Sequence, residues 1–163
     1  MITRRLMMAG TALGIAGCAP SKFKTYNGPR VDRIQIFKEK GVMQLISGTN
    51  LLKAYDVEFG FSPKGHKQFE GDGRTPEGTY RINRRNPNSR FHLSLGISYP
   101  NTDDVAYAQS QGKMPGGEIF IHGTPLGYIG QKDWTWGCIA VTNEEIEEIY
   151  AMVDDGTLIL IMP

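Results

Sequence analysis

The 163-residue sequence has little cysteine, little histidine and almost no excess of charge. Its two cysteines are too few for the framework of several disulfides that holds many small secreted domains together. Its formal net charge of +1 at pH 7 provides no strongly basic surface, so no nucleic-acid partner is expected. Internal repeats and low-complexity stretches are also missing. Any chemistry must therefore come from a few reactive side chains.

The N-terminus has the order of a bacterial export signal. Arg4 and Arg5 precede an apolar run of 11 residues, 6–16, well short of the roughly 20 residues that a membrane-spanning helix needs. Small residues then lead to Cys18, as is typical of a lipoprotein signal peptide. We expect residues 1–17 to be removed and Cys18 to carry acyl chains that anchor the exported protein to a membrane. An ordinary secretory signal followed by a chance cysteine is the alternative.

The predicted mature chain is long enough for one domain. Removal of residues 1–17 from the 163 leaves 146, and loss of Arg4 and Arg5 leaves 16 Lys and Arg against 17 Asp and Glu, a formal charge of about −1. Residues 18–30 carry no apolar period and are predicted to be a short tether, followed by a catalytic domain over 31–163. Ala19, in place of Asp after the lipidated cysteine, favours the outer membrane of the cell envelope.

The domain is predicted to be mostly β. Short apolar runs separated by turn residues are typical of a meander, and residues 91–99 alternate strictly between apolar and small or polar side chains. The expected strands cover residues 33–36, 42–46, 51–59, 91–99 and 157–161. We therefore predict a β-sandwich or open barrel with one or two short helices.

One helix has a clear start signal. Thr142 and Glu145 have the spacing of a capping box, and apolar residues recur behind them at helical spacing: Ile146, Ile149, Tyr150 and Val153. The polar stretch 100–117 is long for a plain connection. It is predicted to be either a lid over a substrate or a solvated excursion with a short helix around 104–110.

His122 and Cys138 are the candidate catalytic pair. His122 follows the predicted strand 118–121, in which residues 119–121 are apolar, and Cys138 lies 16 positions later, so the chain can loop out and return beside the same strand. A thiol becomes a strong nucleophile when a nearby imidazole takes its proton, and we expect the pKa of this thiol to be lowered. A structural histidine and a buried, inert cysteine are the alternatives. His66, His92 and these two residues lack zinc-type spacing, so neither a metal nor another cofactor is expected.

The residues around this pair favour acyl chemistry. Gly137 permits a tight backbone turn, which would let the N–H groups of Trp136, Gly137 and Cys138 point at a developing oxyanion. No Asp or Asn stands near the histidine in the sequence, so a backbone carbonyl, such as that of Gly123, would orient the imidazole.

These motifs resemble the L,D-transpeptidase catalytic-domain family of bacterial cell-wall enzymes. Members carry a histidine followed by a small residue, then a [Ser/Thr]-x-Gly-Cys signature about fifteen residues on, which corresponds here to His122-Gly123 and to residues 135–138, Thr-Trp-Gly-Cys. Residues 71–80, Gly-Asp-Gly-Arg-Thr-Pro-Glu-Gly-Thr-Tyr, resemble a second family block. Taken alone, residues 75–78 of that block predict a β-turn. The resemblance covers roughly residues 31–161.

The resemblance implies a thiolate that attacks peptidoglycan stem peptides between the L-centre of diaminopimelate and D-alanine. It makes Cys138 the nucleophile, His122 the general base, the Gly123 carbonyl the group that holds the imidazole, and residues 136–138 the oxyanion hole. Thr135 belongs to the same signature and is included in the substrate-binding set.

Two departures from the family pattern bear on substrate binding. Trp136 stands where histidine is frequent, and Ala140 stands where an arginine that can bind stem carboxylates is frequent. The sequence leaves open which cation takes the place of that arginine. Arg84, Arg85 and Arg90 form either a solvated basic loop or such a carboxylate site.

Three functions remain open from the sequence. The first is a transpeptidase that transfers the acyl group to an amine for wall crosslinking or protein attachment. The second is an L,D-carboxypeptidase or amidase that uses water as acceptor. The third is a non-catalytic peptidoglycan-binding lipoprotein, which would need neither His122 nor Cys138.

Overall fold

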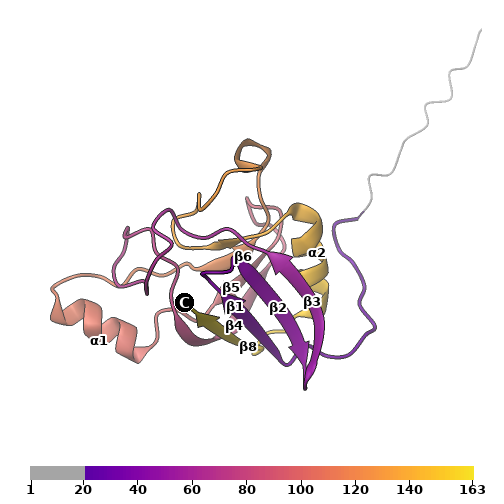
Figure 1. Cartoon of the computed structure of the whole chain (residues 1–163), viewed down its shortest axis with the longest axis horizontal. Coiled ribbons are helices and arrows are strands. Elements are labelled where there is room, and N and C mark those ends of the chain that lie inside the picture. The colour runs from indigo at the N-terminus through magenta and orange to yellow at the C-terminus, as the bar shows by residue number, and fades with distance from the viewer. Residues whose placement is uncertain (1–20) are drawn as a thin grey trace, which may run out of the picture.

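Eight strands form a single curled sheet in the computed structural model, which describes residues 21–163 (Figure 1). The predicted signal peptide, residues 1–17, and Cys18 lie outside the described residues. The strands are β1 (Arg33–Phe37), β2 (Val42–Ser47), β3 (Asn50–Asp56), β4 (Gly78–Asn86), β5 (Ser94–Ile97), β6 (Phe120–His122), β7 (Ile139–Ala140) and β8 (Leu158–Met162). Their order across the sheet is β3-β2-β1-β8-β4-β5-β6-β7.

The centre of the sheet joins the two ends of the domain. β1 pairs antiparallel with β2, as the meander predicts, and its other edge pairs in parallel with the last strand, β8, so that Ile34 lies opposite Ile159. β8 then pairs antiparallel with β4. Alternation along β1 buries Ile34 and Ile36 and leaves Arg33 only partly buried, which fixes the register of the strand.

The sheet curls so that its far edges approach each other. Beyond β3, Glu58 bridges to Ala140 in β7, and Gly60 bridges to Thr135 just before it. The predicted mostly-β architecture is therefore confirmed in its open-barrel form, because one curled sheet, and not two stacked sheets, surrounds the core. These bridges also bring the chain after β3 against the Thr-Trp-Gly-Cys segment.

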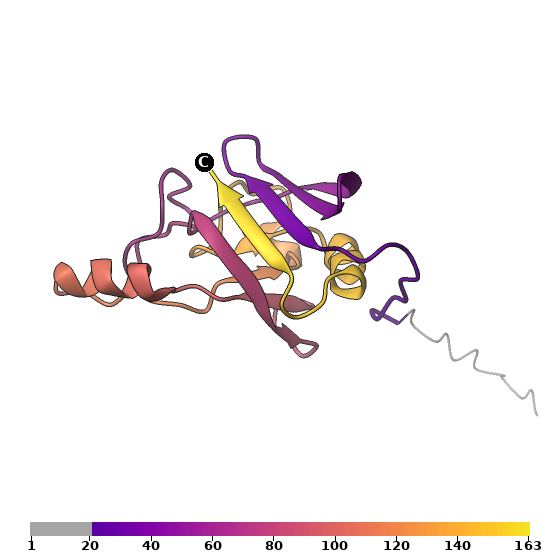
Figure 2. The same ribbon diagram turned by 90° about the horizontal axis from the view of Figure 1, so that it is seen from below.

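Two α-helices lie at opposite ends of the molecule (Figure 2). α2 (Asn143–Met152) begins with the predicted capping box of Thr142 and Glu145 and packs against β5 and β6. α1 (Thr102–Ser110) begins at Asn101, whose side chain forms a second capping box with Asp104. The excursion 100–117 thus contains the short helix that the sequence offered as one alternative. A 3₁₀ turn, η1 (Leu126–Tyr128), lies in the loop between β6 and β7.

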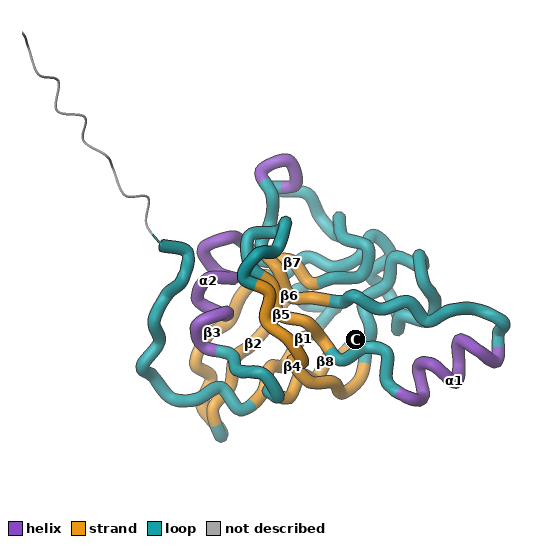
Figure 3. The backbone as a smooth tube through the Cα atoms, turned by 180° about the vertical axis from the view of Figure 1, so that it is seen from behind, coloured by secondary structure: helices purple, strands orange, loops and turns teal. Residues whose placement is uncertain are grey.

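The core fills the inside of the curled sheet beneath α2. Its members are mostly aliphatic and almost fully buried, and the largest of them are Ile34, Ile36, Met43, Leu45, Ile82, Leu93, Leu95, Ile121, Ile139, Ile146, Ile149 and Ile159. Each such side chain stabilises the domain by roughly 1.5–3 kcal/mol relative to exposure. Loops, in contrast, occupy the region between β7 and α1, where the candidate site lies (Figure 3).

Two local predictions were wrong. Residues 91–99 do not form one long strand: β5 is confined to Ser94–Ile97 and is buried on both faces, while Phe91 turns inward beside His122. Residues 75–78 do not form a β-turn, because Thr75 and Pro76 are buried in extended chain that leads into β4. Tertiary contacts determine both conformations: Thr75 accepts a hydrogen bond from the N–H of Gly60 at 3.3 Å, and Phe91 stacks on His122.

The described part of the predicted tether lies along the domain. Residues 21–30 contain no helix or strand, but Lys22 donates to the carbonyls of Pro87 and His92, and Lys24 lies 3.5 Å from the Glu147 carboxylate. Within residues 21–163, none of the helices has the length and apolar character needed to cross a bilayer.

Candidate active site

The imidazole of His122 is held in one tautomer at the end of β6. His122 is only 2% exposed, and its Nδ1 lies 2.7 Å from the carbonyl oxygen of Gly123. A carbonyl can only accept, so Nδ1 carries the proton and donates, which leaves Nε2 as an unprotonated base. Phe91 stacks on the ring at 4.4 Å, and Trp134 contacts it edge to face at 5.7 Å.

Close packing around Gly123 leaves no room for a side chain. A side chain at this position would overlap the side-chain oxygen of Asn143 and lie 3.0 Å from the carbonyl oxygen of Phe91. Because all these neighbours belong to the packed body of the domain, only glycine fits here without movement. The sequence expectation that the Gly123 carbonyl orients the imidazole agrees with its contact to Nδ1.

The register of β6 and β7 brings Cys138 to the same face of the sheet as His122. The two strands run in parallel, with Ile121 opposite Ile139 and His122 opposite Ala140. One position earlier, Cys138 lies beside Phe120, and side chains alternate along a strand, so Cys138 points to the face of Phe120 and His122. The thiol is half-buried, and its Sγ lies 3.5 Å from the carbonyl oxygen of Glu118.

Both members of the pair are held in the uncharged form. Burial raises the pKa of the Cys138 thiol, and this effect outweighs the backbone N–H of Phe120 and the charge of Lys67, which act in the opposite direction. Burial also lowers the pKa of His122, although its bond to Gly123 opposes the shift. The expectation of a lowered thiol pKa is therefore wrong. Both groups are therefore uncharged near neutral pH, and they lie on the same face of the sheet.

Two hydrogen bonds of the Thr135 side chain stabilise the turn that leads to Cys138. The Thr135 hydroxyl donates to the Cys138 carbonyl at 2.7 Å and accepts from the N–H of Gly137 at 3.1 Å. The Gly137 N–H, expected in an oxyanion hole, thus has a partner inside the turn, which leaves the N–H groups of Trp136 and Cys138 as candidates. Gly137 has a φ of 121°, and a side chain there would lie 2.5 Å from the carbonyl oxygen of Arg74, so glycine is required.

The two tryptophans have different environments. Trp136 is 73% exposed and contacts Phe61 edge to face at 5.1 Å, so it forms an apolar wall open to solvent beside Cys138. Trp134 is partly buried, stacks on Tyr128 at 4.2 Å and lies against His122. The structure thus brings a second tryptophan to the site, in addition to Trp136 of the predicted motif.

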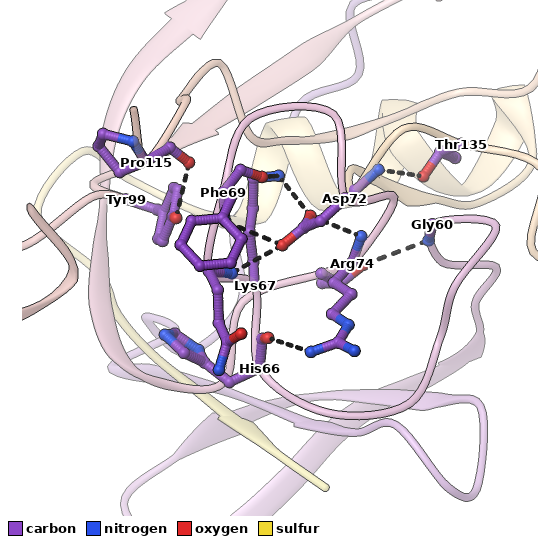
Figure 4. A network of polar contacts seen from close by, with 12 residues as sticks. Gly60, His66, Lys67, Phe69, Asp72, Arg74, Tyr99, Pro115 and Thr135 are labelled. Atoms are coloured by element: carbon purple, nitrogen blue, oxygen red, sulfur yellow. Dashed lines mark hydrogen bonds and ion pairs between the residues drawn. The ribbon is translucent and has the colours of Figure 1, made fainter. Parts of the chain in front are cut away.

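A partly buried carboxylate organises the loop behind the site (Figure 4). Asp72 accepts from the ammonium of Lys67 at 2.9 Å and from the backbone N–H groups of Gln68, Phe69 and Arg74 at 2.7, 3.0 and 3.0 Å. Burial alone would raise the pKa of Asp72, but these donors outweigh it and lower that pKa. Lys67 is 2% exposed and also donates to the Phe69 carbonyl at 3.0 Å.

This loop packs directly on the turn that carries Cys138. A side chain at Gly60 would overlap the carbonyl of Gly73 and would lie 2.9 Å from the Gly137 nitrogen. The N–H of Phe61 donates to the Thr135 carbonyl at 2.9 Å. The loop organised by Asp72 therefore supports the turn that carries Cys138. Asp72 and Arg74 belong to the second motif block, but nothing in the sequence indicates that this loop packs on the turn of Cys138. Nothing in the sequence indicates that Phe91 stacks on His122 either.

The histidines of the described region are engaged in separate contacts. His66 pairs with Asp104 at 2.9 Å, and His92 pairs with Glu147 at 2.8 Å. Within residues 21–163, no group of three or more His, Cys, Asp or Glu side chains is arranged to hold a metal ion.

The L,D-transpeptidase catalytic domain (YkuD) family model matches residues 32–161, and the chain belongs to this family. The protein named "Putative L,D-transpeptidase YafK" from Escherichia coli (strain K12) is 33% identical over 136 residues, which is 80% of this chain and 50% of YafK. The chain therefore spans about half the length of the curated relatives it matches.

Solved structures agree on the fold. The helical cell shape determining protein Pgp2 from Campylobacter jejuni has a TM-score of 0.65 and 27% identity over 83% of this chain and 49% of Pgp2. An L,D-transpeptidase from Xylanimonas cellulosilytica has a TM-score of 0.54 and 15% identity over 84% of this chain and 63% of that chain. At that lower identity the likeness concerns the fold alone.

Proposed function

We propose that this protein is a peptidoglycan L,D-transpeptidase in which Cys138 is the nucleophile and His122 the general base. One observation carries the proposal: the Gly123 carbonyl fixes His122 with Nε2 unprotonated, on the same face of the sheet as the Cys138 thiol. A protein that only bound peptidoglycan would need neither the buried tautomer nor the thiol. Family membership supports the same chemistry.

In the proposed reaction, the thiol attacks the carbonyl carbon between diaminopimelate and D-alanine. The thiol proton passes to Nε2 of His122 as the S–C bond forms, and the oxyanion lies at the N–H groups of Trp136 and Cys138. Collapse breaks the C–N bond, and the imidazolium gives its proton to the leaving amine, so D-alanine departs and a thioester remains. An acceptor amine then attacks the thioester, loses a proton to His122 and releases the thiol.

The acceptor decides which member of this chemistry the protein is. An amine from another stem or from a protein gives wall crosslinking or protein attachment, whereas water gives the carboxypeptidase or amidase alternative. The likeness to Pgp2, a protein that determines helical cell shape, supports a contribution to cell-wall biogenesis and shape.

We also propose that the protein is a lipoprotein of the cell envelope. Residues 1–17 would be a signal peptide, Cys18 the acylated anchor, residues 18–30 the tether and 31–163 the catalytic domain. The anchor would hold the domain at a membrane facing peptidoglycan, and Ala19 favours the outer membrane.

Mass spectrometry of purified muropeptides after incubation with the mature domain tests the proposed function. We expect release of D-alanine together with a crosslinked product, and no change with the Cys138→Ala variant. Release of D-alanine with tripeptide as the sole product would favour water as acceptor. Unaltered muropeptides with the wild-type domain would support the non-catalytic binder.

A further inference from the structure

Arg84 lies on the candidate-site face because of an irregularity in β4. Ile82 pairs with Ile97 and Arg84 pairs with Gly96, so two steps along β4 match one step along β5, and Asn83 is the extra residue of a bulge. The bulge moves Arg84 to the face opposite Ile82 and the core. Along the same pairing, Gly96 lies opposite Phe120 in β6, and Phe120 lies beside Cys138.

Because Gly96 has no side chain, the side chain of Arg84 can extend across the sheet above it. A Cβ at Gly96 would lie 2.6 Å from Cγ and 2.9 Å from Nε of Arg84, so the arginine side chain occupies that space. Its guanidinium carbon reaches a point 4.6 Å from the centre of the Phe120 ring. Its Nη2 donates to the Glu118 carboxylate at 2.8 Å.

The two residues that hold Arg84 also border the thiol. The Glu118 carbonyl oxygen is the atom 3.5 Å from Sγ of Cys138, and Phe120 is the neighbour of Cys138 across the strand pair. The side chains of Arg84 and Glu118 are 47% and 77% exposed, so a substrate anion can replace the Glu118 carboxylate. A guanidinium has five N–H donors in a fork that matches a carboxylate, and Glu118 accepts from one nitrogen.

Two other cations, Arg85 and Lys67, are committed elsewhere. Arg85 donates to the carbonyls of Tyr150 and Val153 at the end of α2, and its guanidinium lies 3.9 Å from the centre of the Tyr150 ring. Lys67 is bound to Asp72. Ala140, the position where the family pattern predicts an arginine, is 1% exposed and uncharged.

We infer that Arg84 is the substrate-binding residue that recognises a free carboxylate of the donor stem peptide, with Glu118 as a competing internal anion. This inference rests on the proposed function. Two carboxylates of the stem fit the chemistry: that of the leaving D-alanine and that on the D-centre of diaminopimelate. Peptides amidated at one or the other separate the two sources.

Calorimetric binding of the stem tetrapeptide to the Cys138→Ala variant tests the inference without turnover. Three peptides are compared: the free acid, the C-terminal amide and the diaminopimelate amide. We expect the free acid to bind about tenfold more tightly than one of the amides. Adding Arg84→Gln should bring this ratio close to one. Adding Glu118→Gln should increase the ratio, because it removes the competing carboxylate.

Arg81→Gln in the same background is the matched control. Arg81 lies on the same strand but donates to the Gly156 carbonyl, away from the site, so the ratio should stay unchanged. A ratio near one before Arg84 is altered, equal weakening of all three peptides by Arg84→Gln, or no binding of any peptide at millimolar concentration would overturn the inference.

Turnover of the same peptides by the domain with Cys138 intact, with and without Arg84→Gln, separates this inference from the proposed function. If the wild-type domain cleaves the tetrapeptide while Arg84→Gln retains the same preference, in kcat/KM, for the free acid over the amides, the Arg84 assignment fails and the proposed function stands. If it cleaves none of the peptides while binding retains an Arg84-dependent preference, the proposed function fails and the carboxylate site stands.

Discussion

Replacing Asp72 by asparagine should destabilise the domain through Lys67. The side chains of Lys67 and Asp72 are 3% and 14% exposed, so the substitution leaves a buried ammonium without its counter-charge. Loss of one partner of a buried pair costs about 3–5 kcal/mol, and the residual exposure of Asp72 favours the lower end, about 3 kcal/mol. At about 2–4 °C per kcal/mol for a domain of this size, Tm should fall by roughly 6–12 °C.

A double-mutant cycle isolates the pair from the backbone bonds of Asp72. Urea unfolding would be measured for Asp72→Asn, Lys67→Met and the double variant, with Glu70→Gln, an exposed acid of the same loop, as the control. We expect the double variant to cost about 2 kcal/mol less than the sum of the single variants, and the control to stay within about 0.5 kcal/mol of wild type. Additive costs would show that the pair does not stabilise this loop.

The same carboxylate predicts the sign of a pH dependence. The folded-state pKa of Asp72 lies below its unfolded value of about 3.9, so its contribution is fully present above that pH and is lost as the pH falls through the folded-state pKa. Stability measured from pH 6 to pH 2 should therefore fall more steeply for wild type than for Asp72→Asn. Identical curves would contradict this role.

Three further outcomes are expected. Because burial raises the pKa of Cys138, the midpoint of its alkylation rate against pH should lie above about 8.5. Because burial lowers the pKa of His122, the acidic limb of the kcat/KM profile should lie below about pH 6.5. A plateau of the alkylation rate at lower pH would indicate a preformed ion pair instead. Chelation should leave activity intact, since Cys138 is assigned to nucleophilic work; a loss that zinc reverses would overturn that mechanism. Cys18→Ala should move the protein from the membrane to the soluble fraction; unchanged membrane binding would refute lipidation.

The sequence predicted the helices and strands that depend mainly on interactions between residues close together in the chain. Thr142 and Glu145 predicted the start of α2, because a capping box needs only residues three apart. The strand expected over residues 33–36 corresponds to β1. The extended chain at 75–78 and the inward turn of Phe91 were missed, because contacts with distant parts of the chain override local propensity there.

For the candidate site as well, residue identities follow from the sequence, whereas properties that depend on tertiary packing do not. Cys138 and His122 are proposed as its reactive residues from their types, spacing and family motif, and the structure places them on one face of the sheet. The direction of the Cys138 pKa shift was not predicted correctly, because it depends on how deeply tertiary packing buries the thiol. The place of Arg84 was left open between a solvated loop and a site, because it depends on a bulge and on the empty position at Gly96, which become visible only when β4, β5 and β6 are paired.

Covalent capture of the stem peptide on Cys138 tests the central claim most directly. The mature domain would be mixed with the stem tetrapeptide, quenched rapidly with acid and measured by intact-protein mass spectrometry. We expect a mass gain equal to the tetrapeptide minus D-alanine, located on Cys138 by peptide mapping and absent from Cys138→Ala and Cys138→Ser. Serine should not replace the thiol, since its hydroxyl pKa is far higher and the two residues act as a unit. The same adduct on Cys138→Ala, or D-alanine release by that variant at the wild-type rate, would contradict the account.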